Sequence, residues 1–202
     1  MSKLRLGVFG GTFDPIHNTH LAIACAARRQ ARLDKVLFVV AANPPHKMDA
    51  TCASADDRLA LVEAAISSLS GMEVSRIELE RKGASYTADT LEAIKAAQPD
   101  AEIYLILGMD ALMDLPRWKS PERILAAASL LAVPRPGECV VPPMLDGRFE
   151  LLDFPETDIS STDIRRRIAD GDPCEDALPG DVRRLIAERG LYRECPEHTP
   201  RG

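Results

Sequence analysis

Two histidines three residues apart lie in a glycine-containing segment near the start of the chain. The segment reads Gly10-Gly11-Thr12-Phe13-Asp14-Pro15-Ile16-His17-Asn18-Thr19-His20. Histidines at this spacing can face one ligand together, either as donors to phosphate oxygens or as metal ligands. Glycines allow a phosphate or a base to approach the backbone closely. The alternative is an ordinary turn between a strand and a helix, with two surface histidines.

The two standard phosphate-binding fingerprints are absent from the sequence. The turn does not follow G-x-G-x-x-G, and no G-x-x-x-x-G-K-[ST] occurs anywhere. A dinucleotide-dependent dehydrogenase and a P-loop kinase are therefore disfavoured. Zinc is disfavoured as well, because the histidines are not part of H-E-x-x-H and no third ligand follows at a recognisable spacing. We predict no dedicated metal site in the protein.

A second group of polar residues occupies positions 159–165, where the sequence reads ISSTDIR. The hydroxyls of Ser161 and Thr162 precede Arg165 at the predicted start of a helix. Hydroxyls, free N–H groups and an arginine in the first turn together suit a polyphosphate. The alternative is simple capping of the helix, for which serine and threonine are the usual residues.

Two loops between these segments contain polar residues that could select a second substrate. Asn43 and Lys47 follow the second predicted strand, where Lys47 could reach a phosphate. The alternative for that segment is a proline-stiffened loop with a solvated lysine. Tyr86 and Thr87 begin a predicted helix, whose free N–H groups could hold a carboxylate.

Asp110 and Trp118 are the remaining candidates for substrate binding. Asp110 follows a buried strand, so its carboxylate is well placed to accept hydrogen bonds from ribose hydroxyls, although it could equally be a helix cap. Trp118 is the only tryptophan and could stack on a flat heterocycle. A lone aromatic residue is more often simply packed in the core.

Both polar segments resemble motifs of one superfamily. Residues 10–20 resemble the signature of the HxGH-type nucleotidyltransferases, which have a Rossmann-like fold, and residues 159–165 match their ISSTxIR motif at every fixed position. The family usually has glycine where this chain has Thr19. The resemblance implies that His17 and His20 contact ATP phosphates and that Lys47 and Arg165 act with them as electrostatic clamps. It implies an ATP site that also contains Gly10, Gly11, Thr12, Phe13, Ser161 and Thr162.

The order and spacing of all these segments resemble the bacterial nicotinate mononucleotide adenylyltransferase family over nearly the whole chain. The resemblance implies transfer of an adenylyl group from ATP to nicotinate mononucleotide, with Mg²⁺ delivered by ATP. It implies that Trp118 stacks on the pyridine ring, that backbone around Tyr86 and Thr87 receives its carboxylate, and that Asn43, Lys47 and Asp110 contribute to the site.

Three other functions stay open from the sequence. Another superfamily member, such as phosphopantetheine adenylyltransferase or a cytidylyltransferase, would share the ATP motifs, but the Trp118 and Tyr86-Thr87 segments count against it. A class I aminoacyl-tRNA synthetase fragment is disfavoured because the chain is short and acidic. A non-catalytic nucleotide sensor that retains the fold is the alternative from a different class.

The elements that must position these residues follow from the apolar pattern. Strands are predicted at 4–9, 36–41, 73–79, 103–107, 130–133 and 149–153, and helices at 18–31, 54–69, 87–97, 121–128, 161–170 and 181–189. The alternation predicts a Rossmann-like, doubly wound parallel sheet with helices on both faces. Ligands bind at the carboxyl ends of strands in such sheets. We predict one domain, 1–202, with a core over 1–155 and C-terminal helices over 156–202 that carry the second motif.

Composition limits the partners and the compartment. The 202 residues are 46% hydrophobic and 28% charged, which is ordinary for a globular protein. The net charge of -6 argues against a general nucleic-acid binder. Because no apolar run is long enough to cross a membrane, we expect a cytoplasmic protein without membrane contact. Five widely spaced cysteines predict reduced thiols, and a homo-oligomer stays possible.

Overall fold

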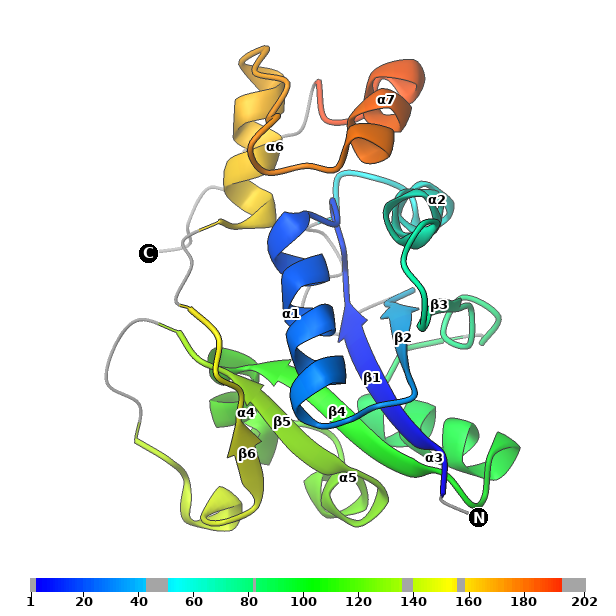
Figure 1. The fold of residues 1–202 in the computed structure, drawn as a ribbon, viewed down its shortest axis with the longest axis vertical. Coiled ribbons are helices and arrows are strands. Elements are labelled where there is room, and N and C mark those ends of the chain that lie inside the picture. Colours follow the sequence, from blue (N-terminus) through cyan, green and yellow to red (C-terminus); the bar gives the residue numbers. More distant parts are fainter. Residues whose placement is uncertain (1–2, 43–50, 82, 136–139, 156–158, 194–202) are drawn as a thin grey trace.

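A parallel sheet forms the centre of the computed structural model, which describes residues 3–42, 51–81, 83–135, 140–155 and 159–193. Within these ranges six strands pair, each parallel to its neighbours, in the order β3-β2-β1-β4-β5-β6 (Figure 1). They are β1 (Arg5–Gly11), β2 (Lys35–Val40), β3 (Met72–Ser75), β4 (Glu102–Gly108), β5 (Ser129–Val133) and β6 (Phe149–Leu151). The strand order reverses between β1 and β4, which is the switch point of a Rossmann sheet.

Helices cover both faces of the sheet, as Figure 1 shows. On one face lie α1 (Asn18–Gln30) and α2 (Ala55–Ile66), and on the other lie α3 (Thr87–Ala97), α4 (Met109–Asp114) and α5 (Pro121–Ala127). Two further helices, α6 (Ser161–Ala169) and α7 (Gly180–Arg189), stand beyond the carboxyl ends of the central strands and share the hydrophobic cluster of α1 and α2. The predicted doubly wound sheet is confirmed.

Successive side chains of the central strands point alternately into two separate hydrophobic clusters, one on each face of the sheet. In β4, Leu105 and Leu107 pack with α3, α4 and α5, whereas Tyr104 and Ile106 pack with α1 and α2. Successive side chains of a strand point to opposite faces, so a central strand buried on both faces must be apolar at every position. This requirement explains why β4 was readily predicted from its continuous apolar run.

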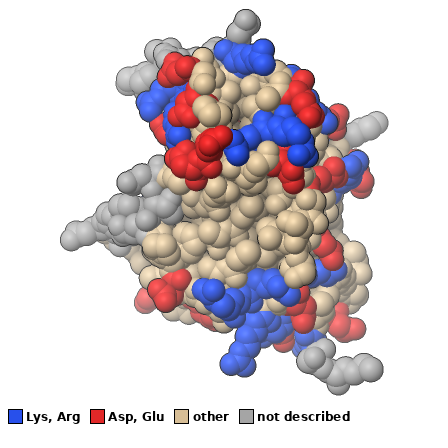
Figure 2. Space-filling model, turned by 45° about the horizontal axis from the view of Figure 1, so that its top comes forward, with Lys and Arg blue, Asp and Glu red and all other residues tan. Residues whose placement is uncertain are grey.

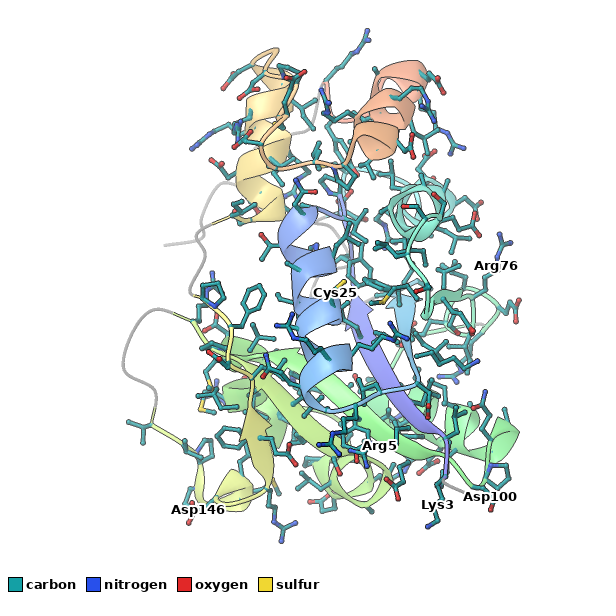
Figure 3. The ribbon with its side chains drawn as sticks, viewed as in Figure 1. Lys3, Arg5, Cys25, Arg76, Asp100 and Asp146 are labelled. Carbon is teal, nitrogen blue, oxygen red and sulfur yellow. The ribbon has the colours of Figure 1, made fainter. Side chains whose placement is uncertain are left out.

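Charged residues lie at the end of the sheet where the strands begin. Arg5 donates to Glu102 at 3.1 Å, and its guanidinium lies 4.6 Å from the centre of the Tyr104 ring. Figure 3 shows Arg5 and Lys3 at this edge, away from α6 and α7. The opposite end of the sheet, where the carboxyl ends of the strands lie, is therefore the end at which a ligand can bind.

Ion pairs gather on the C-terminal helices. Figure 2 shows both signs of charge crowded at the top of the molecule, above a largely uncharged band. Arg167 pairs there with Asp172 at 2.7 Å and with Asp176 at 2.6 Å, and Arg183 pairs with Glu175 at 2.6 Å. Exposed pairs of this kind contribute only about 0–1 kcal/mol each. The buried contacts described below must therefore fix where these helices lie.

Several predicted boundaries are wrong for local reasons. The strand predicted at 73–79 ends at Ser75, because the chain then turns with the Glu80 N–H bonded to the Arg76 carbonyl. The helix α4 was not predicted, since six residues are too few for a periodic pattern. The caps of α1 and α6 are His17 and Ser160 rather than the residues one or two positions later.

The cysteine prediction is wrong in one place. Cys25 and Cys174 carry free thiols, whereas Cys52 is disulfide-bonded. Cys139 and Cys195 lie outside the described residues. In the part of the chain that the structure describes, no helix is long and apolar enough to cross a membrane.

Candidate active site

A cavity of about 580 Å³ opens at the switch point of the sheet. Its walls come from the carboxyl ends of β1, β2 and β4, the start of α3, and α4 with the segment after it. Seven of the residues predicted from the sequence line it: Gly10, Gly11, Thr12, Tyr86, Thr87, Asp110 and Trp118. Its position is where open α/β sheets bind their ligands.

The glycines at the end of β1 have different roles. A Cβ on Gly10 would meet nothing within 4 Å, so the backbone there is open to a ligand. A Cβ on Gly11 would lie 2.9 Å from the Phe13 ring. Phe13 itself is only 3% exposed and packs against His20 with ring centroids 5.2 Å apart. Only its backbone can therefore meet ATP directly, while its ring supports the histidine.

The two predicted histidines are stacked at the start of α1. Their ring centroids are 3.7 Å apart, and the His17 N–H donates to His20 Nδ1 at 3.3 Å. A neutral His20 that accepts at Nδ1 carries its proton on Nε2. Burial lowers the pKa of His17 to about 4, and burial together with the neighbouring His17 lowers the pKa of His20. Near neutral pH both rings are therefore neutral donors rather than cations.

The two sequence motifs meet although about 150 residues separate them. The Ser161 hydroxyl donates to the Pro15 carbonyl at 3.0 Å, and Arg165 Nη1 donates to the Asp14 carbonyl at 2.8 Å. Arg165 also donates to the Thr162 hydroxyl at 3.4 Å. Within the described ranges Arg165 forms no ion pair with a carboxylate. Among the described residues, its charge is therefore held without an acidic partner beside the loop of residues 12–17, here called the histidine loop.

Four of the residues predicted for the second substrate, Tyr86, Thr87, Asp110 and Trp118, line the cavity, whereas His17, His20 and Arg165 are not among its lining residues. Tyr86 caps α3 with an extended backbone, and the Lys119 ammonium lies 3.9 Å from the centre of its ring. Trp118 is half-buried and packs on the cluster that contains α4 and α5. Asp110 is exposed in the first turn of α4 and pairs with Arg135. Asp110 is not a helix cap, because Gly108 holds that position.

Two predicted residues, Asn43 and Lys47, lie outside the described residues. The sequence reasoning missed five polar residues that line the cavity: Glu78, Ser85, Thr90, Asp114 and Lys119. Glu78 is 8% exposed and accepts a hydrogen bond from the Thr90 hydroxyl at 2.8 Å. Burial raises the pKa of Glu78. The only signal for it was an acidic residue between Ile77 and Leu79 in a segment predicted as strand.

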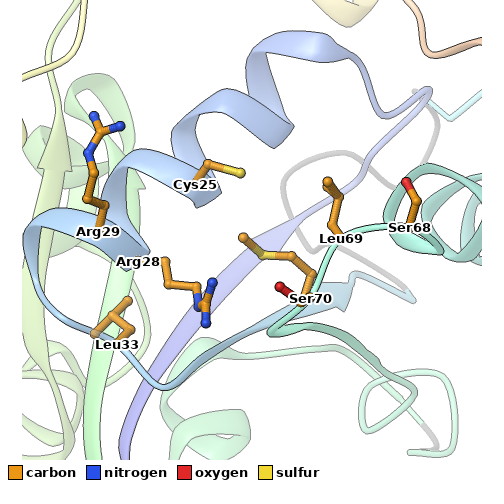
Figure 4. A pocket seen from close by; sticks show the side chains of 8 residues that line it. Cys25, Arg28, Arg29, Leu33, Ser68, Leu69 and Ser70 are labelled. Carbon is orange, nitrogen blue, oxygen red and sulfur yellow. The ribbon is translucent and has the colours of Figure 1, made fainter.

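A second hollow of about 540 Å³ lies between the end of α1 and the α2–β3 connection. Figure 4 shows that Arg28 and Arg29 leave α1 in different directions there. The polar groups do not converge on one point, and none of the residues predicted from the sequence lines this hollow. In volume it nearly equals the cavity at the switch point, so the chemistry of the lining distinguishes the two.

The chain is similar to several known proteins. The cytidylyltransferase-like family model matches residues 8–167. A relative from Roseiflexus sp. (strain RS-1), named probable nicotinate-nucleotide adenylyltransferase, is 44% identical over 200 residues, which cover 96% of this chain and 100% of the relative. A relative of the same name from Halalkalibacterium halodurans is 42% identical over 190 residues, covering 94% of this chain and 91% of the relative.

A solved structure extends the likeness to three dimensions. Plasmodium falciparum nicotinic acid mononucleotide adenylyltransferase complexed with NaAD superimposes with a TM-score of 0.78, covering 94% of this chain and 97% of that one. The sequence identity is 18%, so this likeness speaks for the fold.

Proposed function

The chain belongs to the nicotinate-nucleotide adenylyltransferase family, and we propose that its cavity and histidine loop join ATP to nicotinate mononucleotide. The products are nicotinate adenine dinucleotide, an intermediate of NAD biosynthesis, and pyrophosphate. One observation supports this assignment above the others. The Arg165 guanidinium, from the second motif, donates at 2.8 Å to the Asp14 carbonyl of the first motif, so the two motifs form one site.

The reaction needs no nucleophile from the protein. An oxygen of the mononucleotide 5′-phosphate attacks the α-phosphorus of ATP, and the bond from that phosphorus to the bridging α–β oxygen breaks. Pyrophosphate leaves with the electron pair. A phosphate monoester is already anionic near pH 7, so the rate comes from positioning and from stabilisation of negative charge.

The histidine loop provides the donors for ATP. His17 and His20, neutral before ATP binds, donate N–H groups to phosphate oxygens, and Arg165 supplies the positive charge. The backbone of Gly10, Gly11 and Thr12 faces the nucleotide, because the space beside Gly10 is open. From the family resemblance we also assign Lys47 a phosphate contact and Asn43 a place in the mononucleotide site.

The part of the cavity formed by the start of α3, by α4 and by Trp118 accepts the mononucleotide. Trp118 lines the cavity and provides a flat face for the pyridine ring. The N–H groups at the start of α3, next to Tyr86 and Thr87, receive its carboxylate, and the dipole of the helix favours an anion there. Asp110 accepts hydrogen bonds from ribose hydroxyls and exchanges its Arg135 partner for them.

We propose that Mg²⁺ is the divalent metal and that it arrives bound to ATP. The side chains that flank the phosphate position are hydrogen-bond donors and an arginine, which suit phosphate oxygens rather than a cation. Mg²⁺ retains several waters and is commonly held through substrate phosphates. Bound there, it neutralises part of the charge on the polyphosphate.

We further propose that residues 1–202 act as one domain in the cytoplasm, with these two substrates and no nucleic acid as partners. The C-terminal helices share their hydrophobic cluster with α1 and α2, which supports one folding unit. The acidic net charge of -6 supports the exclusion of nucleic acid.

Pyrophosphate release from Mg-ATP tests the function directly. The purified protein is assayed with nicotinate mononucleotide, nicotinamide mononucleotide and phosphopantetheine side by side. We expect strong preference for the first. Activity with another acceptor would retain the fold and chemistry and overturn the pocket assignment. No release with any acceptor would overturn the enzyme assignment in favour of a nucleotide sensor.

A further inference from the structure

Asp14 lies at a buried junction under the histidine loop. It is 3% exposed, and its carboxylate accepts three hydrogen bonds. Two come from the N–H groups of Cys52 at 2.7 Å and Ala53 at 3.2 Å, just before α2. The third comes from the Tyr192 hydroxyl at 2.8 Å. Because a buried carboxylate is costly unless its oxygens are bonded, this residue has a strongly preferred position.

The backbone of the same loop is held by two arginines. Arg58, which is 1% exposed, donates to the Thr12 carbonyl at 2.7 Å and to the Ala41 carbonyl at 2.8 Å. Arg165 donates to the Asp14 carbonyl. The loop that ends at His17 is thus fastened by side chains from α2, α6 and the segment after α7.

Tyr192 reaches Asp14 from the far end of the described chain. Gly190, with φ of 64°, ends α7 in the left-handed conformation and lets the chain turn back. The Tyr192 ring is 5% exposed and belongs to the cluster around α1 and α2. Burial raises the pKa of its hydroxyl, so the group remains a donor throughout any practical assay.

We propose that Tyr192 is a positioning residue for adenylyl transfer, acting through Asp14 on the loop that ends at His17 and, through it, on His20 in α1. The inference rests on the proposed function. Asp14 fixes the chain direction three residues before the cap of α1, and the His17 N–H in turn bonds to His20. Loss of the Tyr192 hydroxyl leaves a buried carboxylate oxygen without that donor, and the loop can then adopt other arrangements.

A purely structural role predicts something different. Tyr192 would then only anchor the end of α7, and its loss would resemble the loss of any other anchor. Arg189 provides that comparison, because it joins α7 to α2 through Asp57 at 2.7 Å without touching the histidine loop. Arg189→Gln is therefore the matched control for Tyr192→Phe.

The kinetic test compares these two variants with the wild-type protein. We expect Tyr192→Phe to lower kcat about tenfold, as for a misplaced catalytic donor, and to leave the KM for nicotinate mononucleotide within about twofold. Arg189→Gln should retain wild-type kcat. Unchanged kcat in Tyr192→Phe, or an equal loss in both variants, would overturn the proposal. Wild-type pyrophosphate release is measured first, so failure of the proposed function is seen separately.

A spectroscopic readout does not depend on activity. The chain has four histidines, and ¹H–¹⁵N spectra of their rings report the surroundings of His17 and His20. We expect Tyr192→Phe to shift these signals and Arg189→Gln to leave them unchanged. Unshifted signals in Tyr192→Phe would overturn the proposal. If that variant does not fold, Asp14→Asn is measured instead, with the same expected shift and the same overturning result.

Discussion

The two sides of the proposed site, the histidine wall around His17 and the cavity wall that contains Trp118, differ in how far the protein itself fixes them. On the histidine side, His17 and Asp14 are 4% and 3% exposed, and hydrogen bonds from distant segments hold the loop. On the opposite side, Asp110 and Lys119 are exposed, and Trp118 is only half-buried. We propose that the first wall is organised before ATP arrives and that the second is completed by its ligand. Substitutions on the first wall should therefore lower turnover, and those on the second should weaken binding.

The largest expected effect is on turnover at the histidines. His17→Ala and His20→Ala should each lower kcat by about 10² to 10³, the usual cost of removing one preorganised donor. The KM for nicotinate mononucleotide should change little. Steady-state pyrophosphate release at saturating substrates measures this. Near-wild-type kinetics in both variants would show that the fixed wall has no catalytic part.

The same wall should make stability depend on pH. The pKa of His17 is lowered from its usual value of 6.5 to about 4, so between these values the unfolded chain binds a proton that the folded chain does not. The contribution of His17 to the free energy of unfolding is therefore fully present near pH 7. It is lost as pH decreases from 6.5 through 4, which lowers the free energy of unfolding by about 3 kcal/mol in total.

Urea denaturation at pH 7 and pH 5 tests this dependence, with His17→Gln as the control that lacks the titrating ring. The loss of stability on acidification should be smaller in that variant. Equal losses in both proteins would contradict the assignment of a buried, neutral His17.

A smaller effect is expected on the ligand-completed wall. Trp118→Ala should raise the KM for nicotinate mononucleotide about tenfold, because stacking of a base on an aromatic side chain contributes about 1–3 kcal/mol. The KM for ATP should stay within about twofold, and Trp118→Phe should retain most of the affinity. Equal losses for both substrates would mean that Trp118 is only packed in the core.

The smallest effect is expected at the second hollow. Its volume nearly equals that of the cavity, yet Arg28 and Arg29 point apart (Figure 4). Arg28→Ala should leave kcat and both KM values within about twofold of wild type. A larger change would show that the hollow is coupled to the reaction.

The sequence predicted what depends on local pattern. Alternation of apolar runs with capped helices is enough for the doubly wound sheet, and Ser54 caps α2 as expected, accepting from the Asp57 N–H at 3.1 Å. The short helix α4 could not be predicted, because six residues show no period. The meeting of residues 10–20 with 159–165 was expected only from the family resemblance, because no local pattern predicts a contact over that separation.

The residues missed around the site share another cause. Glu78 and Arg58 are buried polar residues whose partners are set by tertiary packing. Residue type and spacing alone therefore do not predict their place near the site. Tyr192 bonds to a carboxylate 178 positions earlier, and nothing in the chain near either residue encodes that pairing. Asn43 and Lys47, predicted from the resemblance, stay predictions.

The bond between Tyr192 and Asp14 also sets an order of events during protein synthesis. A ribosome adds about 5–20 residues per second, so the histidine loop emerges roughly 10–35 s before the hydroxyl that fastens it. During that interval the nascent chain contains every residue of the loop but not the Tyr192 hydroxyl. If Tyr192 has the proposed role, the loop reaches its fully fastened arrangement only after translation has passed Tyr192, although Arg58 can hold the Thr12 carbonyl earlier.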